Sequence, residues 1–177
     1  MNEKILTSWV QDIKNAGEND KLGAEAERQR TIAATVIVES RGAIYWEELL
    51  AAIRLQAIDC KEIGVTVEVS KDDHKTEHES TISIAASSGF PSARFAWTYL
   101  TYQTNGKTLV VRQLRDTETE QKIEQVPFAV SSAGELSLYY HRKSAAPAQF
   151  AETLLRQMVN YVLHPPAFIT QDQIEID

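Results

Sequence analysis

The sequence predicts an α+β protein with N-terminal helices, a six-strand antiparallel meander sheet, and a long C-terminal helix packed on the sheet. Two patterns predict this class. Apolar side chains recur at every second position between residues 65 and 142, and they recur at helical spacing before and after that region. A chain of 177 residues suffices for one well-cored domain, which we place at 1–166, helical over 1–62, with an acidic tail at 167–177.

The N-terminal third is predicted to be helical. Residues 3–16 place apolar side chains on one helical face, and Gly17–Asp20 then indicates a break. Helical spacing resumes at 22–40 and continues at 43–62, with a candidate break at Arg41–Gly42. These last two segments form either one long helix or a kinked pair.

Cap signals mark the ends of the helical regions. Gly64 lies just past the N-terminal helical region, where a glycine can adopt the left-handed backbone of a cap. The C-terminal helix is expected at 146–163, with Ser144 as its cap and Pro147 in its first turn. Its apolar stripe is broad, which predicts burial against the sheet.

Six segments of the central region are predicted to be strands, because they alternate and are rich in β-branched and aromatic residues. Short turn signals separate them, and connections this short suit antiparallel neighbours. The predicted strands are Val65–Val69, Thr81–Ala85, Arg94–Tyr102, Thr108–Leu114, Ile123–Val130 and Leu136–His141. Pro127 lies inside the fifth strand, and because proline cannot donate to the ladder we expect a bulge or an unpaired side there.

The Asn105-Gly106 pair is the strongest hairpin signal, since a type I′ turn needs positive φ at both central residues. A two-residue loop then sets the register of the flanking strands. The predicted pairs are Tyr102 with Leu109 and Leu100 with Val111 on one face, and Tyr99 with Arg112 and Trp97 with Leu114 on the other. Both faces are partly apolar, which predicts that helices on both sides, a ligand or a second subunit cover part of each.

Composition and charge restrict the class of protein. The net charge is −7, and no segment is basic enough to indicate a nucleic-acid-binding protein. The same negative charge argues against binding to anionic membrane surfaces. A single cysteine, Cys60, excludes a disulfide within one chain and suits a reducing compartment. The first residues lack the apolar run of a signal peptide. We therefore expect a cytoplasmic protein that binds neither nucleic acid nor membrane.

The sharpest metal-binding pattern lies in the segment Asp72–Glu79. It combines two imidazoles with several carboxylates, which are common metal ligands, and the candidate ligands are His74 and His78. The segment falls in a predicted hairpin connection and lacks the glutamate of the metalloprotease motif. An ordinary polar loop explains the same residues, and we expect no cofactor.

A second candidate site lies on the predicted hairpin. An arginine on an aromatic strand face is typical of a pocket for a carboxylate or a planar ligand. The residues expected to line it, between the sheet and the C-terminal helix, are Trp97, Tyr99, Tyr102 and Arg112. The alternative is a cross-strand pair of Tyr99 with Arg112 that has no wider purpose.

The sequence carries no glycine-rich phosphate loop, no Cys-x-x-Cys pair and no Gly-x-Ser-x-Gly elbow. This lack, the acidity and the two partly apolar sheet faces favour a non-enzymatic binding protein that engages a protein partner, such as a chaperone, an adaptor or an immunity-type module. Self-association belongs to the same hypothesis. The alternative is a small-ligand or enzymatic pocket between the sheet and the C-terminal helix.

Overall fold

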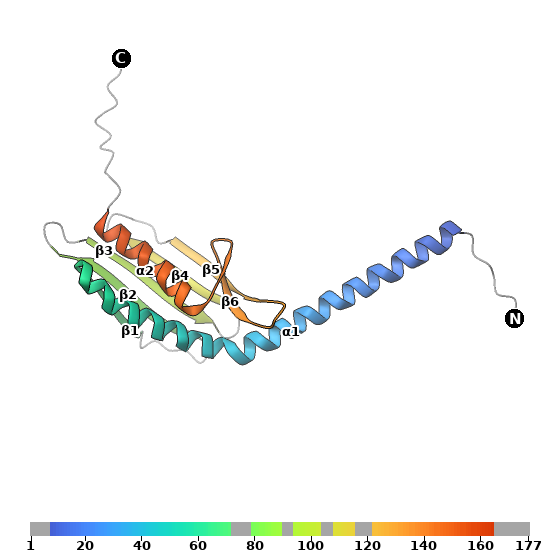
Figure 1. Cartoon of the computed structure of the whole chain (residues 1–177), viewed down its shortest axis with the longest axis horizontal. Coiled ribbons are helices and arrows are strands. Elements are labelled where there is room, and N and C mark those ends of the chain that lie inside the picture. The colour runs from blue at the N-terminus through green and yellow to red at the C-terminus, as the bar shows by residue number, and fades with distance from the viewer. Residues whose placement is uncertain (1–7, 72–78, 90–93, 104–107, 116–121, 165–177) are drawn as a thin grey trace, which may run out of the picture.

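The structure, a computed structural model, confirms the α+β class. It describes residues 8–71, 79–89, 94–103, 108–115 and 122–164, with their side chains from Asn15 onward except that of Arg115. Along the chain, the long helix α1 (Ser8–Asp59) and the short 3-10 helix η1 (Cys60–Ile63) precede the antiparallel sheet, and α2 (Pro147–Leu163) follows it. Figure 1 shows α1 crossing the sheet beside α2, while its first half projects away.

The N-terminal region is one helix of 52 residues, so neither predicted break ends it. Gly17–Asp20 and Arg41–Gly42 both lie inside α1. A glycine inside a helix costs only about 1 kcal/mol relative to alanine, and the helix formers around these glycines outweigh that cost. The helix bends where it reaches the sheet (Figure 1), and there the Ser40 hydroxyl donates to the carbonyls of Val36 at 2.8 Å and Ile37 at 3.2 Å. Such bonds to the preceding turn often bend helices.

The capping residues predicted for the helix ends are confirmed in part. Gly64 is the predicted cap, with φ of 76° and its N–H donated to the Lys61 carbonyl at 3.1 Å. Pro147 begins α2 as predicted. Ser144 does not cap that helix, because it is taken up by a seventh strand, and the Gln149 side chain instead accepts the Ala146 N–H at 3.1 Å.

The sheet is a meander of seven antiparallel strands in sequence order. They are β1 (Val65–Lys71), β2 (Glu79–Ser88), β3 (Arg94–Gln103), β4 (Thr108–Arg115), β5 (Lys122–Val130), β6 (Leu136–Tyr140) and β7 (Lys143–Ala145). The extra strand, β7, follows a two-residue turn in which His141 and Arg142 have φ of 49° and 64°. Positive φ at both positions is typical of a type I′ turn, but without Gly, Asn or Asp the sequence gives no signal for it.

The predicted hairpin register is confirmed. Tyr102 lies opposite Leu109 and Tyr99 opposite Arg112, although the turn between the strands lies outside the described residues. No bulge forms at Pro127, because β5 pairs with β4 in unbroken register up to Pro127. The pairs of β5 with β6 begin only at Phe128, so Pro127 has the unpaired side that was the other expectation. Its partner is Thr108, the first residue of β4, so the missing N–H falls at the end of the ladder, where its loss matters least.

One face of the sheet and the two helices enclose the core. Strand alternation turns every second side chain of β2 and β3 toward α1 and α2, and those side chains are buried. The largest fully buried ones in the molecule include Leu49, Leu50 and Ile53 of α1, Phe150 and Leu154 of α2, and Ile82, Ile84, Leu100 and Leu109 of the sheet. Both described helices lie on this one face, so the expectation of helices on both sides is not met within the described residues.

Gly42 lets α1 approach the sheet closely. A Cβ at this position would lie 2.5 Å from the Tyr102 hydroxyl oxygen. The Tyr102 ring cannot move aside easily, because it is buried, stacks on Trp46 at 5.9 Å between ring centroids and meets Phe128 edge-on at 6.1 Å. The glycine is therefore needed for packing and not for helix termination.

We expect Gly42→Ala to destabilise the protein by about 1–2 kcal/mol, because overpacking outweighs the better helix propensity of alanine. Urea denaturation measures the change. Gly23→Ala is the matched control, since a Cβ there meets nothing within 4 Å, and its midpoint should not fall. Tyr102→Phe removes the atom in closest contact, so adding it to Gly42→Ala should restore stability. A Gly42→Ala protein as stable as wild type would refute the close-packing argument.

Candidate functional site

The four residues predicted to line a pocket do not lie on one face of the sheet. Trp97, Tyr99 and Arg112 share the face that carries no described helix, which we call the open face. Tyr102 lies on the other face, in the core against Trp46. A strand turns successive side chains to opposite sides, so odd and even positions of β3 cannot line the same pocket. Tyr102 is therefore a core residue, and the other three remain a candidate surface.

An aromatic row follows β3 on the open face. Phe95 and Trp97 stack with their ring centroids 5.5 Å apart, and Tyr99 comes next along the strand, opposite Arg112. Ile123 of β5, the cross-strand neighbour of Arg112, is 62% exposed. Phe95 is also exposed, whereas Trp97 and Tyr99 are half-buried. An arginine beside aromatic and aliphatic groups that remain partly accessible can bind a planar anion or the apolar surface of a protein.

The space between the sheet and α2 is largely filled. Phe150, Leu154 and Met158 of α2 are buried against the sheet. A crevice there, lined in part by Thr98 and Met158, has a volume of about 10 Å³, which holds about one water molecule. Ligand pockets measure about 300 Å³ or more, so this crevice does not serve as one.

The predicted metal ligands, His74 and His78, lie outside the described residues. Among the residues that the structure does describe, no three His, Cys, Asp or Glu side chains come together in a way that could hold a metal ion. The metal site therefore stays a prediction from the sequence.

Residues 15–33 of α1 form the longest run of exposed residues in the described chain. Every residue from Asn15 to Ala33 is exposed, and Figure 1 shows this segment, which we call the arm, extending away from the sheet. Leu22 is 70% exposed. With Ala26 and Ala33 it occupies one side of the helix, since these positions are separated by whole helical turns. The arm thus exposes Leu22 and two alanines on one side, with the amide of Gln29 in the same row.

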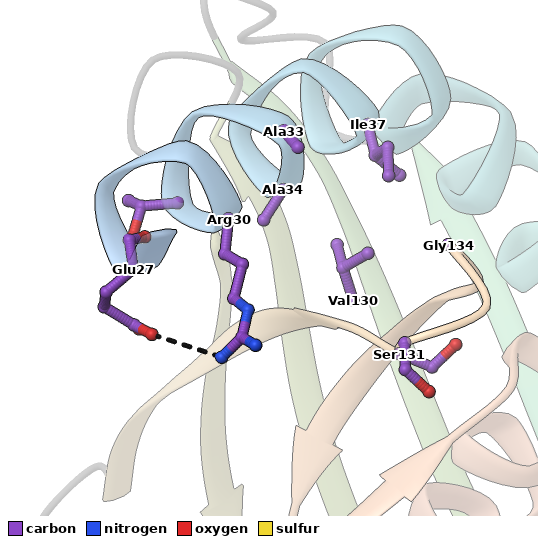
Figure 2. Close-up of a pocket in the computed structure, with 10 residues that line it drawn as sticks. Glu27, Arg30, Ala33, Ala34, Ile37, Val130, Ser131 and Gly134 are labelled. Atoms are coloured by element: carbon purple, nitrogen blue, oxygen red, sulfur yellow. Dashed lines mark hydrogen bonds and ion pairs between the residues drawn. The ribbon is translucent and has the colours of Figure 1, made fainter. Parts of the chain in front are cut away.

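A hollow of about 720 Å³ lies where the arm meets the turn between β5 and β6. We call it the arm groove, and Figure 2 shows it between α1 and that turn. Ala33, Ala34 and Ile37 of α1 line it on one side, and Val130 of β5 lines it on the other. Small and aliphatic side chains leave room for apolar groups of a binding partner.

Charged groups stand at one end of the arm groove. The Arg30 guanidinium lies 3.7 Å from a Glu27 carboxylate oxygen, and both groups are exposed (Figure 2). The opposite wall is rigid, because the Ser131 hydroxyl accepts the N–H groups of Ala133 at 3.3 Å and Glu135 at 3.1 Å. An exposed charged rim beside a wall fixed by hydrogen bonds suits protein recognition.

A second hollow, of about 350 Å³, lies further along α1 and is lined in part by Ile44, Glu48 and Glu135. Between the hollows, Arg41 Nη1 donates to the Gly134 carbonyl at 3.3 Å.

Tyr45 also lines the second hollow, and its hydroxyl donates to the Ala145 carbonyl at 2.7 Å. Burial raises the pKa of Tyr45, so the hydroxyl keeps its proton, and can donate this bond, in more alkaline solution than an ordinary tyrosine.

Sequence reasoning missed the arm and both hollows. Helical spacing at 22–40 predicts a helix with one buried side and one solvent-exposed side. It does not predict that the helix extends past the sheet. The available signal was the scarcity of large apolar residues between Lys14 and Thr31, where Leu22 stands alone. The hollows gave no signal, because they depend on how closely α1 approaches the β5–β6 turn.

Within the part of the chain that the structure describes, no helix is long and apolar enough to cross a membrane. Searches for similar proteins found no matching family model, no matching curated protein and no matching solved structure.

Cys60 is held as a thiol, and we expect it to react slowly with iodoacetamide at neutral pH. Burial and the neighbouring Asp59 carboxylate raise its pKa, which lowers the fraction of reactive thiolate. The Cys60 Sγ also contacts the Gln56 carbonyl at 3.4 Å. Asp59→Asn removes one cause and should speed the reaction, as followed by mass spectrometry at several pH values. Labelling as fast as that of a free cysteine in a peptide would contradict the raised pKa.

Proposed function

We propose that this protein is a non-enzymatic binding module that engages a protein partner through the arm and the arm groove. The observation that supports the proposal is the arm itself, a helical segment exposed along its whole described length. The net charge of −7 favours a partner with a basic surface.

The arm lacks the packing that usually stabilises a helix. Most helical stability in proteins comes from tertiary packing of an apolar face, and isolated helices are marginal in water. The arm also contains Gly17 and Gly23, each of which costs about 1 kcal/mol relative to alanine. A Cβ built on either glycine would meet nothing within 4 Å. A partner that packs against the arm would supply the missing contacts.

The arm groove continues the same surface. Glu27, Arg30 and Ala33 belong to the arm and also line the groove. An amphipathic helix is the partner element that suits this shape, because it can lay apolar side chains into a groove and keep charged ones at the rim. Glu27 and Arg30 would then face charges of opposite sign on the partner.

Matched aspartate substitutions on opposite sides of the arm test the proposal. Ala26 lies on the side of Leu22, whereas Ala24 lies on the far side, and both are exposed. We expect Ala26→Asp to weaken partner binding about tenfold or more, because it places a carboxylate in an apolar contact. Ala24→Asp should bind as wild type does.

The partner is isolated with the full-length protein from the cells that make it, and the affinity is then measured with both proteins purified. Hydrogen exchange of the arm amides gives an independent measure and should slow when the partner is added. Equal affinities for the two aspartate variants, or an arm that exchanges as fast in the complex as alone, would overturn the proposal.

A second candidate function is the binding of a planar carboxylate on the open face, which Arg112 beside Tyr99 favours. Thermal unfolding with a panel of aromatic carboxylates tests it, since a ligand that binds only the folded state raises the unfolding temperature. We expect any such rise to disappear in Arg112→Ala. An undiminished rise in that variant would place the ligand elsewhere.

A further inference from the structure

The C-terminal half of α1 carries apolar side chains on its outer side as well as in the core. Ile44, Ala51 and Ile58 are spaced by seven residues, which is close to two helical turns, so they lie in one row. Leu49 and Ile53, on the other side of the helix, are fully buried. In the row, Ile44 is 59% exposed, Ile58 is 63% exposed, and Ala51 between them is also exposed. We call this the outer row.

Two unpartnered charges flank the outer row on one side. Glu47 and Arg54 are seven residues apart and both exposed, and neither forms an ion pair or hydrogen bond with another described residue. Leu55, on the other side of the row, is 66% exposed. A surface helix normally turns polar side chains to this side, so solvation of α1 does not explain the row.

We propose that the outer row pairs with the outer row of a second copy of this chain, as two antiparallel α1 helices related by a two-fold axis at Ala51. In this arrangement Ile44 of each copy meets Ile58 of the other, and the two Ala51 side chains meet at the axis. Alanine at the crossing lets the helix axes approach to about 8 Å. The same surface then serves both copies, as a two-fold interface requires.

Charge complementarity favours a second copy over an unrelated partner. In an antiparallel pair each flank faces the same flank of the other helix, so Glu47 of one copy faces Arg54 of the other at nearly the same height. The axis repeats the contact, which gives two symmetric ion pairs. Both charges therefore find a partner in the one arrangement that also brings the isoleucines together. In a parallel pair each flank would face the opposite flank of the other copy, so Glu47 and Arg54 would not face each other.

The contact between the two outer rows is large enough for a specific interface. Each copy contributes Ile44, Leu55 and Ile58, more than half exposed, together with Ala51 and the stems of Glu47 and Arg54. Two such sets would bury on the order of 1,000 Å² of surface, which is where specific interfaces begin. The arms leave the pair at opposite ends, so this inference concerns a separate surface and does not depend on the proposed function.

Cysteine crosslinking tests the arrangement in the full-length protein, with Cys60→Ser removing the natural thiol. We expect Ala51→Cys to form a disulfide-linked dimer under mild oxidation, because the two introduced thiols meet at the axis. Ile58→Cys is the matched control, since its two thiols would lie about 21 Å apart along the helices, beyond the reach of a disulfide. Mixing Ile58→Cys with Ile44→Cys should restore crosslinking between unlike chains.

Charge reversal gives the second measurement. Sedimentation velocity of the unmodified chain should show a dimer that dissociates on dilution. Arg54→Glu should weaken it about tenfold or more, because two attractions become two repulsions. The double change Glu47→Arg with Arg54→Glu should restore the affinity, and circular dichroism checks that each variant is folded. A monomer at every concentration, equal crosslinking at positions 51 and 58, or a double variant as weak as Arg54→Glu would each overturn the proposal.

Discussion

The structure depends on one constraint, which is that a single layer of two helices covers one face of a seven-stranded sheet. The burial of Ile82, Ile84 and Leu100 beneath Leu49 and Phe150 forms the core that holds the chain together. The approach of α1 to this face is close enough that only glycine fits at position 42. No described helix covers the side of the sheet that carries Trp97 and Arg112, and the arm extends past the core.

Patterns of two and of 3.6 residues were enough to predict most of the fold. The alternation along β3 and β4 and the Asn105-Gly106 turn gave the correct pairing of Tyr99 with Arg112. The broad stripe of α2 correctly predicted its burial. Glycine misled the prediction of α1, because residues such as Gly17 act as breaks only when the surrounding chain does not favour a helix. The seventh strand escaped notice because His141 and Arg142 adopt positive φ without the usual turn residues.

The candidate sites were less predictable than the fold. Periodicity can assign Tyr102 and Tyr99 to opposite faces, yet proximity in the sequence had suggested one pocket for both. The arm groove forms where Ile37 and Val130, far apart in the sequence, line the same hollow. No local sequence pattern predicts that these two distant segments lie close together in the fold. The outer row of α1 could have been found from the spacing of Ile44, Ala51 and Ile58, but sequence alone does not tell a buried row from an exposed one.

The adjacency of α1 and α2 has a consequence for the order of folding. The two helices come from opposite ends of the domain, and both are needed to cover the same sheet face. During synthesis the meander can pair strand by strand, since each strand bonds to its neighbour in sequence. Half of its cover is nevertheless missing until Phe150 and the rest of α2 leave the ribosome. Until then the nascent chain presents bare core residues of the sheet, a state in which folding proteins are prone to aggregate.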